Sequence, residues 1–208
     1  MTSHPLFSRL YSRMAPGLEQ VGAGAHRDEM LSGLRGRVIE VGAGSGLCFG
    51  HYPSTVTEVV ALEPEPYLRG LAQKAAPAAP VPVRVIDGSA DHLPAEDGSF
   101  DAAVTSLVLC SVPDQIRALT EAHRVLRPGG ELRFYEHVRS DDPRQAKLQE
   151  RTAWIWPHLF GGCHTDRQTE SAMVEAGFRI ERCRRFDFET RITSRPTIPH
   201  IVGTAVRP

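Results

Sequence analysis

Three glycines and two glutamates carry the residue types and spacing that point most directly to chemistry. Gly42, Gly44 and Gly46 alternate directly after a short apolar run rich in valine, and Glu40 and Glu63 flank them. Glycine at alternate positions lets the backbone turn with positive φ and leaves no Cβ between the main chain and a ligand. We therefore expect a small molecule to lie against bare main chain at the carboxyl end of a strand, where open α/β sheets bind ligands.

The second glutamate stands where an acidic residue can bind a ribose. Glu63 ends the apolar run 58–62 and lies 21 residues beyond Gly42, close to the roughly 20-residue offset of such acids. A carboxylate accepts two hydrogen bonds from a cis-diol, and such charge-assisted bonds are the stronger kind. Leu47 occupies the position where the dinucleotide fingerprint needs a glycine. It therefore disfavours a nicotinamide-dependent oxidoreductase on a related fold, which stays open as an alternative.

Composition bounds the class of protein. The 208 residues are 41% hydrophobic and suffice for one sizeable core, and the net charge of -1 gives no excess positive charge for binding nucleic acid. The first 14 residues lack the apolar run of a signal peptide, and no stretch is long enough to span a bilayer. We therefore expect a cytoplasmic protein without a membrane span.

The cysteines do not suggest a metal site. The four of them are widely spaced and form no C-x-x-C pair, so the sequence predicts neither a zinc site nor a disulfide framework. Cys163 and His164 are adjacent, but no other ligands have suitable spacing, and we expect no metal.

The order of apolar runs and turns predicts the elements that must position these residues. Strands are expected at 38–41, 58–62, 81–86, 100–109 and 131–137, with helices at 66–76 and from Ser111-Val112-Pro113-Asp114 onward. This alternation predicts a mostly parallel sheet with right-handed crossovers and helices on both faces. Thr165 and Gln168 have the spacing of a capping box for a helix ending at Gly177. The runs 178–188 and 200–206 are predicted to form an antiparallel hairpin at the sheet edge.

The chain is expected to be a single domain over 1–208. Residues 1–36 have helical apolar spacing and form a preface or lid, in which Tyr11 either covers a bound ligand or packs onto the sheet. Residues 140–165 are charged and then aromatic, and we interpret them as an insert that faces the substrate.

Several motifs together resemble those of class I S-adenosylmethionine-dependent methyltransferases, which have a Rossmann-like seven-stranded sheet. They are Glu40-Val41-Gly42-Ala43-Gly44-Ser45-Gly46, Glu63, Leu93-Pro94 with Asp97-Gly98-Ser99-Phe100-Asp101, and Arg124-Val125-Leu126-Arg127-Pro128-Gly129-Gly130. Three further motifs are similar to the methyltransferase-like group of alkyl-thiol methyltransferases: Leu107-Val108-Leu109-Cys110-Ser111-Val112, Glu136-His137-Val138 and Leu159-Phe160-Gly161-Gly162-Cys163.

The resemblance implies a role for each matching position. The three glycines would back the methionine part of S-adenosylmethionine, and Glu40 would hold their loop or, through water, the cofactor ammonium. Glu63 would accept hydrogen bonds from the ribose. The other positions carried over are Pro64, Ser89 and Ala90 at the adenine, and Thr105, Ser106 and Leu107 beneath the methionine and the sulfonium. Ser89 replaces the family's usual Asp, which removes one charge-assisted contact to the adenine amine.

The acceptor side is predicted from residue chemistry. Transfer from a sulfonium is an in-line displacement, so positioning and exclusion of water supply most of the rate. A thiol acceptor reacts as its thiolate, and His137, at the end of the fifth strand, is the first candidate for its general base or else a structural histidine. Cys110 is expected to be a buried thiol lining the pocket, not a nucleophile. Trp154, Trp156 and Phe160 either wall an apolar pocket or pack the insert onto the sheet, and His158 and His164 are weaker candidates for the base.

The function predicted is methyl transfer to a small-molecule acceptor, with a thiol first. The alternatives are an O-, N- or C-nucleophile of a small metabolite such as a quinol, or a non-catalytic protein that binds S-adenosylmethionine. Nucleic-acid methylation is disfavoured because Ser106-Leu107-Val108-Leu109 stands where the usual Asn/Asp-Pro-Pro-aromatic motif would be. The sequence does not predict the oligomeric state.

Overall fold

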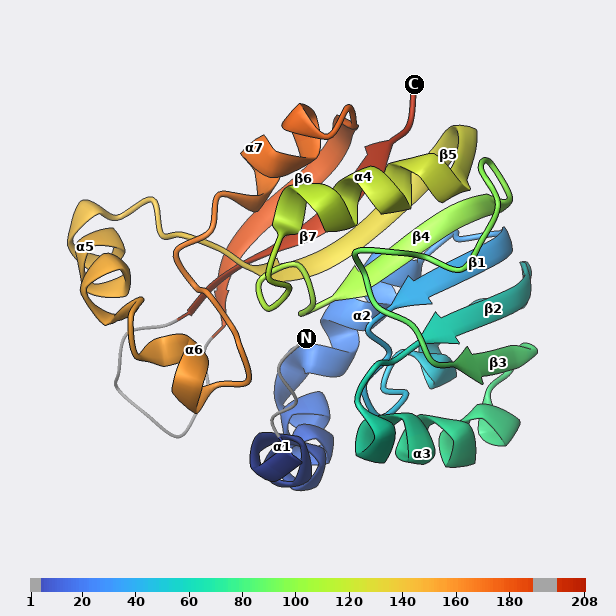
Figure 1. Ribbon diagram of the computed structural model, residues 1–208, viewed down its shortest axis with the longest axis horizontal. Helices are drawn as coiled ribbons and strands as arrows, with labels where there is room; N and C mark the ends of the chain where they lie inside the picture. The colour runs from blue at the N-terminus through green and yellow to red at the C-terminus, as the bar shows by residue number, and fades with distance from the viewer. Residues whose placement is uncertain (1–4, 189–197) are drawn as a thin grey trace.

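The computed structural model describes residues 5–188 and 198–208 and contains one seven-stranded sheet (Figure 1). Its strands are β1 (Gly36–Val41), β2 (Val56–Leu62), β3 (Val83–Ile86), β4 (Phe100–Ser106), β5 (Leu126–His137), β6 (Arg179–Phe188) and β7 (Ile198–Val206). In the order β3-β2-β1-β4-β5-β7-β6, the first five strands are parallel, and β7 and β6 are antiparallel to their neighbours. The predicted fold class and the antiparallel edge hairpin are therefore confirmed.

Helices cover both faces of the sheet. The helical segments are α1 (Pro5–Leu18), η1 (Glu19–Ala23), α2 (Gly24–Leu31), η2 (Phe49–His51), α3 (Pro66–Ala75), η3 (Ala76–Ala78), α4 (Gln115–Val125), α5 (Pro143–Thr152), α6 (Trp156–Leu159) and α7 (Thr169–Glu175). Buried side chains of α4 and α7 pack on one face, and those of α2 and α3 pack on the other. Figure 1 shows α4 and α7 together on one side of the sheet. The described helices include none that is long and apolar enough to cross a bilayer.

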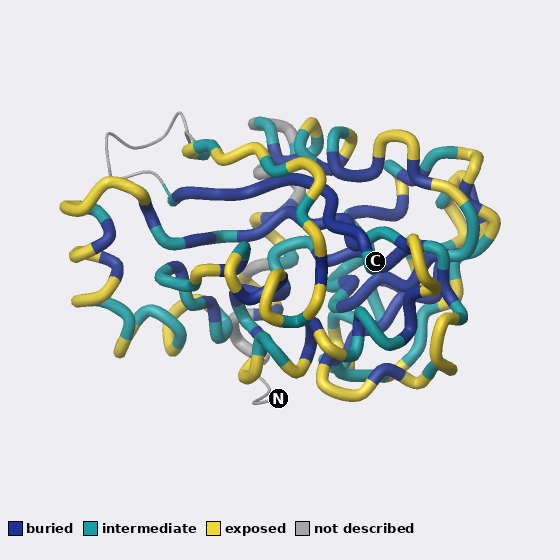
Figure 2. Tube along the Cα trace, turned by 90° about the horizontal axis from the view of Figure 1, so that it is seen from above, coloured by how far each residue is buried: buried dark blue, intermediate teal, exposed yellow. Residues whose placement is uncertain are grey.

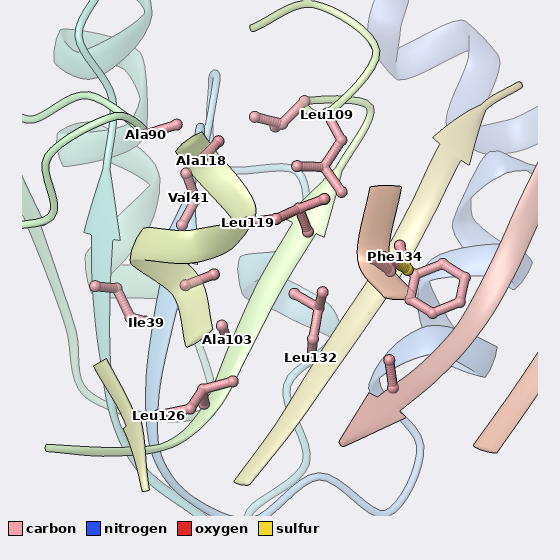
Figure 3. Close-up of a cluster of buried hydrophobic side chains, with 14 of the residues drawn as sticks. Ile39, Val41, Ala90, Ala103, Leu109, Ala118, Leu119, Leu126, Leu132 and Phe134 are labelled. Atoms are coloured by element: carbon pink, nitrogen blue, oxygen red, sulfur yellow. The ribbon is translucent and has the colours of Figure 1, made fainter. Parts of the chain in front are cut away.

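Each central strand contributes to two separate cores because its side chains alternate between the faces. Ile39 and Val41 of β1 pack with Leu119 of α4 in one core, as Figure 3 shows, whereas Val38 packs in the other with Met30 of α2. Figure 2 shows the buried residues running through the middle of the molecule, with the exposed ones concentrated in the outer segments. Burial on both faces explains why these strands have nearly continuous apolar sequences.

Two strand ends differ from prediction, one at each edge of the sheet. β4 ends at Ser106 instead of residue 109, because Leu107 adopts a φ of 59°, the only non-glycine positive φ among the described residues. A left-handed residue cannot continue a strand, so the apolar residues 107–109 form a loop. β5 starts at Leu126 instead of residue 131, and its pairing with β4 has an irregular step between Phe100 and Ala102.

The predicted starts of two helices are wrong. The side chain of Asp114 caps α4 by accepting a hydrogen bond from the Arg117 amide, so the helix begins at Gln115 and Ser111 lies outside it. The helix near the carboxyl end begins at Thr169, and Gln168 makes no side-chain capping bond. An aspartate next to the first turn accepts an amide bond as well as serine does, which explains the three-residue shift at α4.

Helix α1 of the preface and the insert lie at the carboxyl ends of the parallel strands. α1 contacts α3, where the Ser12 hydroxyl lies 3.4 Å from that of Tyr67 and the Arg9 guanidinium lies over the Tyr67 ring. Figure 1 shows α5 and α6 beyond the end of β5, away from the helices that cover the sheet. Both segments therefore border the edge that carries the glycine loop.

Candidate functional site

The loop after β1 presents bare main chain at the predicted place. Gly42, Gly44 and Gly46 all have positive φ, between 58° and 87°. A Cβ on Gly42 would lie 2.6 Å from Val108 Cγ2, and one on Gly46 would lie 2.7 Å from the Phe49 ring, so both glycines permit close packing. A Cβ on Gly44 would point into space that is free of protein atoms within 4 Å. The middle glycine is therefore the one of the three that leaves open space beside the loop.

Glu63 is held against this loop. Its Oε2 accepts a hydrogen bond from the Gly44 amide at 2.8 Å, and its Oε1 accepts one from the Glu65 amide at 2.9 Å. The residue is 6% exposed, and burial raises the pKa of its carboxyl group against the opposing effect of these amides. Each carboxylate oxygen can accept a second hydrogen bond, so the side chain is oriented but not saturated.

Glu40 lies beneath the loop and not at its surface. It is 2% exposed, and its Oε2 accepts a hydrogen bond from the Tyr52 hydroxyl at 2.8 Å. Burial raises the pKa of the carboxyl group to about 7, although hydrogen bonds from Tyr52 and Cys48 oppose the rise. Both partners belong to the segment that follows the glycines. These contacts match the loop-holding role more closely than the water-mediated contact with the cofactor ammonium.

The remaining cofactor positions lie along the same edge. Ala90 is buried, Pro64 and Ser89 are half-buried, and the Ser89 hydroxyl donates to the Asp91 carboxylate. Leu107 and Ser106 are half-buried at the end of β4. Thr105 is buried, and its hydroxyl oxygen has no hydrogen-bond partner in the part of the chain that the structure describes. A buried hydroxyl without a partner is unusual and is satisfied when a ligand or water reaches it.

Glu136 shapes the loop after β4 and was missed as a site residue. It is fully buried on β5, and its carboxylate accepts the amides of Val108 at 3.1 Å and Cys110 at 3.2 Å. These hydrogen bonds take the place of the pairing between β4 and β5, which ends at Ser106. The available sequence signal was a glutamate close to the end of an apolar strand. A carboxylate is buried in such a place only when hydrogen-bond donors compensate its charge.

Three side chains from distant segments converge next to this loop. His137 Nδ1 lies 3.6 Å from Cys110 Sγ and 3.2 Å from Cys163 Sγ, and the three atoms lie within 4.8 Å of one another. Both cysteines are buried and His137 is half-buried. Sequence reasoning placed Cys110 and His137 near the acceptor but missed Cys163 as their partner, because the residues are 26 and 27 positions apart. Soft ligands for a metal therefore do gather here.

The surroundings shift the pKa values of the two thiols in opposite directions. A hydrogen bond from Cys110 and the contact with His137 lower the pKa of Cys163 to about 5, against burial. The same hydrogen bond, together with burial, raises the pKa of the Cys110 thiol well above its usual value. Arg167, also missed, donates to the carbonyl oxygens of Leu109 and Val112 and places a positive charge beside the pair. This part of the edge thus favours a thiolate.

The aromatic residues of the insert are more exposed than predicted. Trp154 is 74% exposed, so little of it is covered by the rest of the protein, and its role as a pocket residue stays a prediction. The rings of Trp156 and Phe160 stack with centroids 4.2 Å apart, with Trp156 half-buried and Phe160 43% exposed. His158 is exposed on α6 and outside the cysteine–histidine cluster. The side chain of Tyr11 lies outside the described residues.

The edge fits S-adenosylmethionine, the cofactor that the resemblance implies. The open space at Gly44 is a cradle that any Cβ would fill, and Glu63 stands beside it with oriented oxygens. The chemistry of these groups suits an adenosyl cofactor, because backbone and carboxylate meet its polar atoms while no side chain blocks it.

Comparison with known proteins agrees with this geometry. The methyltransferase domain family matches residues 39–134. Human thiol S-methyltransferase TMT1B is 34% identical over 183 residues, which cover 85% of this chain and 74% of that protein, and human TMT1A is 32% identical over 174 residues, covering 82% and 70%. A solved S-adenosylmethionine-dependent methyltransferase of Thermotoga maritima, a possible histamine N-methyltransferase, aligns with a TM-score of 0.68 at 22% identity, covering 97% of this chain and 100% of that one.

These matches extend well beyond the cofactor loop. The match to human TMT1B covers 85% of this chain, and the match to the Thermotoga maritima structure covers 97%. The chain therefore belongs to the family of S-adenosylmethionine-dependent methyltransferases.

Proposed function

We propose that this methyltransferase acts on the thiol group of a small apolar molecule. The observation that carries the proposal is the cluster of Cys110, His137 and Cys163 beside the loop that follows β4. A surface of two polarizable sulfurs suits a soft sulfur nucleophile better than a hydroxyl or an amine. The similarity to proteins named thiol S-methyltransferases supports the same choice.

The chain's own residues position the cofactor. Gly44 leaves the approach open, the Glu63 carboxylate is aimed by two amides, and Glu40 fixes the loop from below through Tyr52. Bound S-adenosylmethionine supplies a sulfonium methyl group that is already activated for displacement. The protein therefore needs mainly to align the acceptor and exclude water, which is worth several kcal/mol.

The acceptor side must favour the thiolate. His137 remains our candidate for receiving the acceptor proton, and the positive charge of Arg167 beside the sulfurs favours anionic sulfur nearby. Trp156 and Phe160 form an apolar stack that continues into the loop carrying Cys163, since the Cys163 amide bonds to the Phe160 carbonyl. We place the alkyl part of the acceptor against this stack.

Transfer of a labelled methyl group tests the proposal. The purified protein is incubated with S-adenosylmethionine labelled at the methyl group and with butanethiol, butanol, butylamine, a phenol or a quinol in parallel. The expected product is labelled butyl methyl thioether, with little label on the matched alcohol and amine. Label on a quinol or amine in preference to the thiol would overturn the acceptor assignment, while the family assignment would stand.

The single-domain organisation, a cytoplasmic location and the lid role of residues 1–36 belong to the same proposal. The packing of α1 on α3, directly after Glu63 in the chain, supports the lid.

A further inference from the structure

The cysteine–histidine cluster is built from three segments that the backbone pins together. Cys110 is held by the bond from its amide to Glu136, and its carbonyl accepts the His164 amide at 2.7 Å. Gly162, with a φ of 86°, lets the segment carrying Cys163 approach closely, since a Cβ there would lie 3.2 Å from the Ser111 carbonyl oxygen. The three side chains are therefore fixed together by the fold, without any covalent link.

The separations of the two sulfurs from the histidine nitrogen are close to those of metal ligands. With a Zn–S length of 2.3 Å and a Zn–N length of 2.0–2.1 Å, tetrahedral geometry separates sulfur from nitrogen by ~3.5 Å. The separations from His137 Nδ1 are 3.2 Å to Cys163 Sγ and 3.6 Å to Cys110 Sγ. Two thiolates also neutralise a divalent cation, which suits a site where both cysteines are buried.

The number of ligands indicates an open site. Among the described residues, the group contains two cysteines and one histidine and no fourth histidine, cysteine or carboxylate. Structural zinc sites have four protein ligands, whereas catalytic ones have three and keep one position for water or substrate. We propose that Cys110, His137 and Cys163 bind one zinc ion and leave its fourth position to the thiol of the methyl acceptor.

The site lies on the acceptor side of the cofactor loop. Val108, two residues before Cys110, packs against Gly42, and Glu136 holds both Val108 and Cys110 by their amides. A thiol at the fourth position would thus be presented from the loop that borders the glycines. His137 packs against the buried His200 with ring centroids 4.4 Å apart, which fixes the plane of the ligating ring.

The inference rests on the proposed function and deepens it, because it replaces a general base by a metal. The acceptor S–H bond breaks with loss of the proton to solvent, since a thiol that coordinates a metal is deprotonated. The sulfur lone pair then forms a bond to the methyl carbon while the bond from that carbon to the sulfonium sulfur breaks. The breaking pair leaves with S-adenosylhomocysteine, and the neutral thioether is a weaker ligand than the thiolate. His137 serves as a ligand in this scheme and not as a proton acceptor.

Cobalt substitution tests the metal site without reference to activity. The full chain is freed of metal with a chelator, reduced, and titrated with Co²⁺ and then with Zn²⁺. We expect one Co²⁺ per chain, with the intense near-ultraviolet absorption of thiolate-to-cobalt charge transfer, and its displacement by Zn²⁺. Absence of that absorption in the reduced protein would overturn the proposal, as would recovery of Cys110 and Cys163 as a disulfide that binds no metal.

Matched variants assign the ligands. Cys163→Ser and Cys110→Ser are expected to weaken Zn²⁺ binding by more than about 100-fold, because changes in groups that merely support ligands already cost 10- to 100-fold. Cys183→Ser removes a cysteine on β6 outside the cluster and is expected to bind normally. Unaltered Zn²⁺ affinity in both cluster variants would contradict the assignment, and the wild-type cobalt spectrum stands independently if a variant does not fold.

Binding of a thiol at the fourth coordination position of the metal can be measured separately. Butanethiol added to the Co²⁺ protein without S-adenosylmethionine is expected to shift the visible cobalt bands, whereas butanol leaves them unchanged. A bound metal whose spectrum ignores the thiol would overturn the acceptor role. Methylation of butanethiol at the same rate by metal-free protein would overturn the inference and leave the proposed function standing. Metal binding with no methylation of any thiol would instead remove the proposed acceptor.

Discussion

At the scale of single residues, two main-chain amides orient the carboxylate of Glu63, the residue proposed to bind the ribose. Glu63 accepts hydrogen bonds from the Gly44 and Glu65 amides, so its carboxylate is already oriented before the cofactor binds. Replacing Glu63 by Ala is expected to weaken S-adenosylmethionine binding by about 1.5–3 kcal/mol, the scale of a hydrogen bond to a charged group. Titration calorimetry measures this loss, and an unchanged dissociation constant would remove Glu63 from ribose binding.

Gly44 provides the complementary steric test. A valine there would fill the open cradle, and we expect about a 10- to 100-fold loss of S-adenosylmethionine affinity, since overpacking costs about 1–3 kcal/mol. Gly33→Val is the matched control, because Gly33 also has a positive φ, of 72°, and open space around its Cβ position, but lies far from the loop. The control carries the same backbone strain. If both variants lost affinity equally, the effect would belong to stability and not to the cradle.

Residue types identified this half of the site because its chemistry is local in sequence. The glycines and Glu40 fall within seven consecutive positions, and Glu63 follows at a fixed offset set by one crossover. The cluster of Cys110, His137 and Cys163 has no such regularity, since it depends on how the insert folds back. Burial of Glu136 and exposure of Trp154 are likewise tertiary outcomes that no periodicity encodes.

At the scale of elements, the sheet order follows from the alternation of strands and helices, but the strand ends do not. Residues 107–109 are as apolar as those of β4, yet Glu136 accepts the amides of Val108 and Cys110 and turns them into a loop. Whether these amides pair with a neighbouring strand or with a buried carboxylate depends on Glu136. That residue lies 28 positions from Val108 and 26 positions from Cys110. Local pattern therefore located the strand and missed its end.

The start of α4 gives an element-scale prediction. Asp114→Ala removes the carboxylate that caps the Arg117 amide and is expected to lower the free energy of unfolding by about 1 kcal/mol. Ser111→Ala changes the residue that local pattern favoured as the cap, and its expected effect is within about 0.5 kcal/mol. Urea unfolding of both variants checks the pair. The reverse ranking would restore Ser111 as the cap.

At the scale of the whole molecule, two cores on opposite faces of one sheet hold buried acids at the edge where ligands bind. Glu40 and Glu136 are both buried, and burial raises the pKa of each carboxyl group. A raised carboxyl pKa means that the folded state binds its proton more tightly than the unfolded chain does. Each such group therefore favours folding at low pH and opposes it once ionised, so the site reduces the stability of the fold near neutral pH.

The loss of stability caused by one of these buried acids, Glu40, can be measured. Its carboxyl pKa rises from 4.5 to about 7, so its effect is absent below pH 4.5, grows as the pH rises, and is complete above pH 7. Glu40→Gln keeps an acceptor for the Tyr52 hydroxyl but cannot ionise, and is expected to exceed the wild type in unfolding free energy by up to about 3 kcal/mol at pH 8. Urea unfolding of both proteins between pH 5 and pH 8 measures the divergence.

Glu121→Gln serves as a control of opposite sign. The hydrogen bond with Arg124 lowers the pKa of the Glu121 carboxyl group, so ionised Glu121 stabilises the fold above its unfolded pKa, and this contribution is lost as the pH falls. The Glu121 variant is therefore expected to be less stable than the wild type throughout the pH range in which the Glu40 variant becomes more stable. Parallel curves for Glu40→Gln and the wild type would show that Glu40 ionises alike in the folded and unfolded chains. In that case the acid beneath the glycine loop would be solvated, and the loop would need another support.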